Sequence, residues 1–166
     1  MRRALALAAV IVAAVVIEST LLAHLQLAGT RPDLLVLAVI AVAMAGGPVT
    51  GATFGFAAGL VSDLAFARPV GVSALVYTAI GFALGTARVY VTSSSMWVHL
   101  LIAAAASLAS VWLSGVVLRV FDLSSWDFLL RYGPRIALYN LLLTPLVYPL
   151  VRTIAERAGP GPTDRW

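Results

Sequence analysis

Apolar residues occupy most of this chain in long runs, and polar or charged residues gather in short segments between them. A helix needs about 20 mostly apolar residues to cross the hydrocarbon core of a bilayer, so the length of each run is the main guide to structure. The runs predict six spans, at residues 4–27, 32–46, 48–66, 71–91, 96–120 and 134–154. We therefore expect an all-α integral membrane protein, a six-helix transmembrane bundle in which residues 1–166 form a single transmembrane domain.

The second and third spans are short and lie close together. The second span begins at Pro32-Asp33, which suits the first turn of a helix, and ends at Gly46-Gly47-Pro48. Its length of about 14 residues, or roughly 21 Å, is less than the hydrocarbon core of ~30 Å. Residues 45–50 carry no charge. The two spans either cross the membrane separately or form a re-entrant hairpin, and the number of crossings is even in both cases.

An even number of crossings places both termini on one side of the membrane. Arginines are divided almost equally, six on the terminal side and five on the other, but the charges that flank the first span usually dominate orientation. Arg2 and Arg3 precede that span, so we predict that both termini are cytoplasmic. Residues 122–132 read DLSSWDFLLRY and predict a short helix on the outer surface, with an irregular loop rich in interfacial aromatic residues as the alternative.

Composition narrows the class of protein further. Apolar residues make up 61% of the chain and charged residues 11%, whereas about a quarter of positions are charged in a soluble domain. The segments between spans are too short to bury a core of their own, which argues against a separate soluble catalytic domain. The isoelectric point of about 10.1 then reflects topology and contact with lipid headgroups, and no nucleic-acid partner is expected. The chain has no cysteine, so disulfides and thiolate metal sites are excluded.

Glycines recur at four-residue spacing along the third span, at Gly47, Gly51, Gly55 and Gly59, and the fourth span repeats the spacing at Gly81 and Gly85. Four residues turn a helix by about 400°, so these glycines share one face where another helix can approach closely. We favour packing within the bundle as their role. Docking of a partner's transmembrane helix in the same groove is the alternative.

Three polar residues lie inside or near the predicted spans: Glu18, Asp63 and Asn140. An ionisable group at the centre of the bilayer costs about 2.5 to 3.5 kcal/mol, so each should face the bundle interior or reach an interface. By depth, Glu18 and Asp63 fall in the outer half, and Arg135 enters from the same side. We expect Glu18, Asp63 and Arg135 to form a structural ionic cluster, with Arg31 and Arg68 as competing partners of Asp63. Binding of a proton or a substrate, and snorkelling towards the interface, are the alternatives.

Catalytic and metal-binding patterns are weak in this sequence. The two histidines, His24 and His99, fall near opposite sides of the membrane, so a metal site is not expected. The segment that begins at Gly71 lacks the final glycine of a serine-hydrolase motif, and a pair of Ser73 with His24 is a remote alternative. We expect no enzymatic activity and no cofactor.

The order of motifs from Arg31 to Gly85 resembles that of the bacterial rod shape-determining protein MreD family. Its PDLLL element, glycine-proline turn, glycine-rich segment ending in Asp, and P-x-G-x-x-A-L element match residues 32–35, 47–48, 51–63 and 69–75 in that order. The last span, LLLTPLVYPLVR at 141–152 after Asn140, also looks like the end of that family. Spans one and five match in hydropathy only.

This resemblance implies a non-enzymatic scaffold of the cell-elongation machinery in the bacterial inner membrane, which helps to organise peptidoglycan synthesis and cell shape. The partners it implies are the single-span protein MreC and, through it, MreB, RodA and a class B penicillin-binding protein. The family's fold is thought to resemble the substrate-binding components of energy-coupling-factor transporters. Binding of a small solute, as in such a transporter, is therefore the alternative function.

Overall fold

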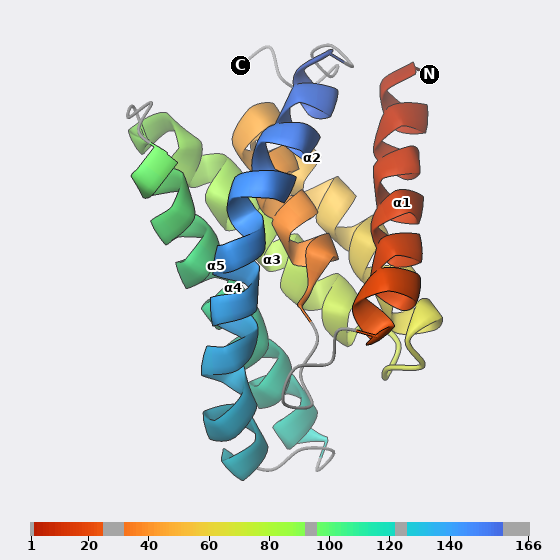
Figure 1. Ribbon diagram of the computed structural model, residues 1–166, viewed down its shortest axis with the longest axis vertical. Helices are drawn as coiled ribbons and strands as arrows, with labels where there is room; N and C mark the ends of the chain where they lie inside the picture. The colour runs from red at the N-terminus through yellow and green to blue at the C-terminus, as the bar shows by residue number, and fades with distance from the viewer. Residues whose placement is uncertain (1, 25–31, 92–95, 122–125, 158–166) are drawn as a thin grey trace.

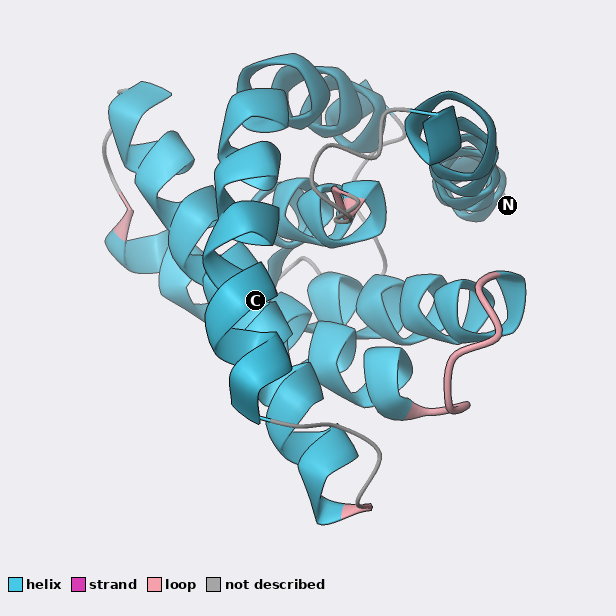
Figure 2. Cartoon of the chain, turned by 60° about the horizontal axis from the view of Figure 1, so that its bottom comes forward, coloured by secondary structure: helices cyan, strands magenta, loops and turns pink. Residues whose placement is uncertain are grey.

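The computed structural model describes residues 2–24, 32–91, 96–121 and 126–157, and the statements below concern these residues. They form five helices: α1 (Arg2–His24), α2 (Leu34–Ala65), α3 (Val72–Ala87), α4 (Met96–Val120) and α5 (Trp126–Arg157), with a 3₁₀ turn, η1 (Arg88–Tyr90), after α3 (Figure 1). Figure 2 shows helices and short connections, with no strand in the described part. Five helices are long and apolar enough to cross a membrane. The fold is that of an all-α integral membrane protein.

The main difference from the sequence expectation lies in the second and third predicted spans, which form two helical segments of the one element α2, joined at a kink. They are separated only by Gly47, whose backbone angles of φ 84° and ψ −175° are not helical. In Figure 1 the first part of α2 rises to this point and the second part descends from it. A Cβ atom added to Gly51 would lie 2.7 Å from the Cβ of Ala43, so the two parts contact each other beside the turn. A single glycine at positive φ reverses the chain here, and no separate loop is needed.

The second difference concerns the segment before the last span, where a separate surface helix was expected over residues 122–132. Residues 122–125 lie outside the described residues, and α5 begins at Trp126 and continues without a break through Pro134 to Arg157. Three prolines lie inside this helix, at Pro134, Pro145 and Pro149. Neighbouring helices and local adjustment of the backbone allow such prolines in membrane helices, so Pro134 does not start a new element.

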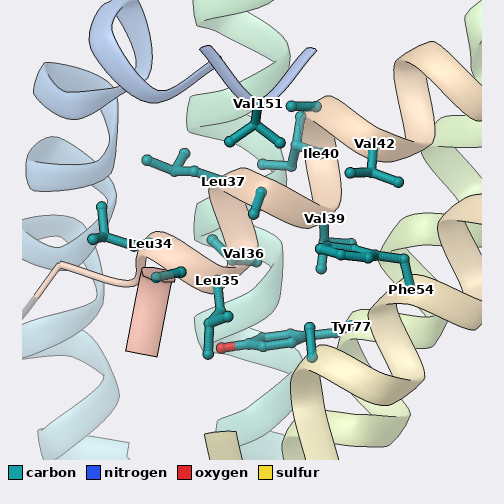
Figure 3. Close-up of a cluster of buried hydrophobic side chains, with 14 of the residues drawn as sticks. Leu34, Leu35, Val36, Leu37, Val39, Ile40, Val42, Phe54, Tyr77 and Val151 are labelled. Atoms are coloured by element: carbon teal, nitrogen blue, oxygen red, sulfur yellow. The ribbon is translucent and has the colours of Figure 1, made fainter. Parts of the chain in front are cut away.

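The first part of α2 forms the centre of the bundle. Each of the ten residues from Leu34 to Ala43 is at most 6% exposed. The second part of α2 and the other helices supply the surrounding side chains, including Phe54, Tyr77 and Val151 (Figure 3). A helix that is apolar on all sides lies either in the core of a protein or in a membrane, and the first part of α2 lies in the core. The outer helices instead expose large apolar side chains, such as Leu5 at 70% and Leu146 at 71%, which suits a surface that faces lipid.

The first turn of α1 and the last turn of α5 lie at the same end of the bundle, at the top in Figure 1. We call this the terminal end. The turn at Gly47 also lies there, because Arg3 near the start of α1 hydrogen-bonds to Thr50 just after that turn. The start of α3 and the end of α4 lie towards the opposite end.

Candidate functional site

Two arginines from different helices hold the turn at Gly47. Nη1 of Arg88 donates a hydrogen bond to the carbonyl oxygen of Ala45 at 3.1 Å, and Nη2 of Arg3 donates to the hydroxyl of Thr50 at 3.3 Å. The carbonyl of Ala45 belongs to the last turn of the first part of α2, where the helix dipole favours a positive charge. The φ angle of 84° favours glycine here, and a Cβ atom at Gly47 would lie 2.9 Å from Cζ of Arg88 and displace that guanidinium.

The glycines predicted to share a groove line the contact between the second part of α2 and the antiparallel helix α3. A Cβ added to Gly51 would lie 2.3 Å from the carbonyl oxygen of Gly81. One added to Gly55 would lie 2.3 Å from the carbonyl oxygen of Tyr77, and one added to Gly59 would lie 2.4 Å from that of Ser73. From the α3 side, an added Cβ at Gly85 would lie 2.5 Å from the backbone of Gly47 and Pro48. Helix α3 of the same chain therefore fills this groove, and the alternative occupant, a partner's transmembrane helix, has no room there.

Asp63 lies at the end of this contact, beside the start of α3. Its carboxylate is 0% exposed and accepts hydrogen bonds from the backbone N–H groups of Gly71, at 2.8 Å, and Ser73, at 3.1 and 3.2 Å. These amides open α3, and the N-terminus of a helix stabilises an anion through its free N–H groups and its dipole. Arg135 is exposed on α5. Asp63 thus has backbone partners in place of the expected ion pair with Arg135.

A second carboxylate, Asp33, lies where α2 begins inside the bundle. Oδ1 of Asp33 accepts a hydrogen bond from the N–H of Val36 at 3.0 Å and so caps the helix, while Oδ2 accepts a short hydrogen bond from the hydroxyl of Tyr77. The N–H of Asp33 donates to Oδ1 of Asn140 at 2.8 Å. Tyr77 and Asn140 are 2% and 0% exposed. This residue therefore joins α2, α3 and α5 through partly buried hydrogen bonds.

Glu18 and Arg68 complete the polar surroundings of Asp33. Glu18 is 2% exposed on α1, and Arg68 belongs to the loop between α2 and α3, where its guanidinium also lies 5.4 Å from the centre of the Phe66 ring. Burial lowers the pKa of Arg68, but the charge of Asp33, together with the effects of Tyr77 and Glu18, outweighs burial and raises the pKa above its ordinary value. We call Glu18, Asp33, Arg68, Tyr77 and Asn140 the Asp33 cluster.

These polar groups hold the helices in place. The carboxylates of Asp33 and Asp63 accept hydrogen bonds from backbone N–H groups at helix N-termini and so stabilise the starts of α2 and α3. In the described part of the chain, no group of three or more histidine, cysteine or acidic residues could hold a metal ion. His99 is 8% exposed and packs against the ring of Tyr148, with ring centres 5.0 Å apart, and the side chain of His24 lies outside the described residues. The geometry supports helix assembly more than it supports a reaction.

Sequence reasoning considered Asp33 only as a helix start and did not connect it with Tyr77 or Arg68. A usable signal was present, because a second span of about 14 residues cannot cross the whole core, and its first residue must then lie at depth. A carboxylate at that position needs donors from other helices. Which helices provide them depends on how the helices are rotated, and run length does not carry that information.

Comparisons with known proteins give one result. A family model described as rod shape-determining protein MreD matches residues 1–157. No curated protein and no solved structure matches the chain.

Proposed function

The chain belongs to the rod shape-determining protein MreD family, and from this membership we propose that it is a non-enzymatic membrane scaffold of the cell-elongation machinery. Family membership supports a role in rod shape determination. The proposed activity is to bind an MreC-like single-span protein and, through it, to associate with MreB, RodA and a class B penicillin-binding protein. In this way the chain would help to organise peptidoglycan synthesis. The proposed location is the bacterial inner membrane, with both termini in the cytoplasm.

The observation that best supports a scaffold is the apolar centre of the bundle. Residues 34–42 are at most 6% exposed and form one apolar cluster with buried side chains from the rest of the described bundle. A site for a small solute is usually a cavity in which a few polar groups converge on an apolar wall. Here the polar groups beside the central helix mostly bond to one another: Asp33 binds Val36, Tyr77 and Asn140.

The lipid-facing surface also supports binding of a single-span partner. Less than a third of the apolar spanning segment of each of α1, α4 and α5 is buried inside the protein, at 17%, 28% and 24%. In α2 the buried share is 78%. Association of membrane helices depends on packing between such surfaces, since burial of apolar area gains little in lipid. The three outer helices therefore provide the available surface for a partner.

The test is co-purification of the tagged full chain with a single-span membrane protein from its native membrane, together with extraction and mass analysis of small molecules. Recovery of an MreC-like protein at a fixed ratio is the expected result. Co-purification of a stoichiometric small solute and an ATPase module would instead support the alternative, a component of an energy-coupling-factor-type transporter. Deletion of the gene should change cell shape under the scaffold proposal and solute uptake under the alternative.

A further inference from the structure

Two prolines lie on the side of α5 that faces away from the bundle. Pro145 and Pro149 are inside the helix, and both are exposed. The apolar residues that share this exposed face are each at least 56% exposed: Leu138, Leu142, Leu146 and Leu150. The buried face of α5 contains Asn140, Thr144 and Tyr148 instead. The two prolines therefore interrupt the backbone hydrogen bonding of α5 on a surface that faces lipid.

Each proline leaves one backbone carbonyl without its usual partner. Proline has no N–H group, so the carbonyl four residues before it receives no α-helical hydrogen bond. In α5 these carbonyls belong to Leu141 and Pro145. The ring of a proline lies against the carbonyl that it leaves free, so both carbonyls open towards the exposed side. At 1.5 Å per residue they are about 6 Å apart along the helix axis. Two hydrogen-bond acceptors thus lie within an otherwise apolar face.

The described part of the chain does not supply donors to these carbonyls. Membrane helices satisfy such groups through serine or threonine hydroxyls, local 3₁₀ or π turns, or neighbouring helices. The hydroxyl of Thr144 donates to the carbonyl of Asn140, and that of Thr153 donates to the carbonyl of Pro149. Helix α5 is α-helical throughout, and no described helix covers its exposed prolines. A helix of another chain is the source of donors that remains.

We propose that the exposed face of α5 around Pro145 and Pro149 binds the transmembrane helix of the single-span partner, whose serine or threonine hydroxyls donate to the carbonyls of Leu141 and Pro145. Two hydroxyls four residues apart on the partner helix have the same spacing of about 6 Å. Acyl chains of lipids have no donors. A second copy of this chain, packed symmetrically through the same face, would present the same acceptors. The inference rests on the proposed scaffold function, because it names the surface that the partner occupies.

The first measurement concerns the purified full chain without a partner. The double variant Pro145→Ala/Pro149→Ala restores both N–H groups, so each free carbonyl gains a partner within the helix. We expect the thermal-unfolding midpoint in detergent to rise by about 2 to 4 °C. Leu142→Ala, on the same face but with no change in backbone donors, is the control and should not raise the midpoint. An unchanged or lower midpoint in the double variant would overturn the premise that these carbonyls lack donors.

The second measurement is recovery of the MreC-like protein with the tagged chain from its native membrane. The double proline variant should lower this recovery about tenfold, since two hydrogen bonds between helices are lost. A chain that is more stable and yet binds its partner less cannot be explained by unfolding. The matched control is Pro134→Ala, an exposed proline of the same helix that lies about 16 Å from Pro145 along the axis. Its recovery should equal that of the unaltered chain.

The third measurement locates the partner by photo-crosslinking. The chain has no cysteine, so a crosslinker can be attached to one introduced cysteine at a time. Leu146→Cys lies on the proposed face, and Leu5→Cys on α1 and Leu101→Cys on α4 are controls with the same exposure of 70 to 71%. We expect only Leu146→Cys to capture the MreC-like protein, at a segment of its span that contains serine or threonine.

The outcomes separate this site from the scaffold function. Capture of the MreC-like protein from α1 or α4 instead, capture of a second copy at Leu146→Cys, or full recovery with the double proline variant would overturn the α5 site and leave the scaffold function standing. Failure to recover an MreC-like protein with the unaltered chain would overturn the scaffold function and, with it, this site.

Discussion

The hydroxyl of Tyr77 on α3 donates a hydrogen bond to the carboxylate of Asp33 at the start of α2, although the two residues are 44 positions apart in the sequence. The same aspartate is linked to Asn140 on α5 through its backbone N–H. One residue thereby fixes the position of the central helix against two of its neighbours. The first part of α2 is too short to reach both surfaces of the membrane. The N–H groups of its first turn, which have no partner within the helix, must therefore find acceptors inside the protein.

Loss of the Tyr77 hydroxyl should destabilise the protein without changing its shape. Tyr77→Phe keeps the ring in the core but removes one donor from a partly buried carboxylate, which we expect to cost about 1 to 3 kcal/mol. Thermal or denaturant unfolding of the purified protein measures this loss. Tyr90→Phe is the matched control, since Tyr90 is 85% exposed. Equal midpoints for the two variants would show that the hydrogen bond contributes nothing to stability.

Asp63 and Arg135 should behave as independent sites. Asp63→Ala removes the acceptor for two backbone N–H groups at the start of α3, and such caps contribute about 0.5 to 2 kcal/mol. Arg135→Gln, at an exposed position on α5, should change stability by less than about 0.5 kcal/mol. The losses in the double variant should add within about 0.5 kcal/mol. A coupling energy well above that value would restore the ion pair expected from the sequence.

Larger residues at Gly55 should separate α2 from α3. Even the Cβ of an alanine would lie 2.3 Å from the carbonyl oxygen of Tyr77, so the backbones must move apart, at a cost of at least about 1 to 3 kcal/mol. We expect Gly55→Leu to reduce the yield of folded protein in the membrane, measured by detergent solubility and gel filtration. Ala57→Leu tests the same increase in size at an exposed position of the same helix. Similar yields from both variants would contradict the role of close backbone contact.

Topology can be tested by reporters placed at the two ends of α5. This helix runs from Trp126 to Arg157, and its last turn lies at the terminal end of the bundle. A reporter fused after Arg157 and one inserted at residues 122–125 should therefore report opposite sides of the membrane. With the termini in the cytoplasm, as proposed, the first should be cytoplasmic. If both reporters gave the same side, α5 would not cross the membrane.

The sequence alone determined the class of protein, most of the helix bounds and the family. Run length predicted a helix at residues 96–120, where α4 lies, and the ordered motifs between Arg31 and Gly85 resemble the family whose model matches the chain. These properties are local, because each depends on the hydropathy or order of neighbouring residues. Glycine spacing likewise predicted a face for close packing, and that face contacts α3 in the structure.

Tertiary structure decided what each polar group binds. Asp63 and Arg135 were expected to meet because both were predicted to lie in the outer half of the membrane. Similar depth does not bring two side chains together, because the rotation of each helix decides where they lie in the membrane plane. The backbone amides at the start of α3 donate to Asp63, and no side-chain pattern in the sequence identifies backbone donors. The position of Asp33 likewise follows from packing around a short central helix, whereas the turn at Gly47 was already indicated by Gly46-Gly47-Pro48 in the sequence. A one-dimensional pattern predicts which groups need partners, and only the folded chain determines which partners lie within reach.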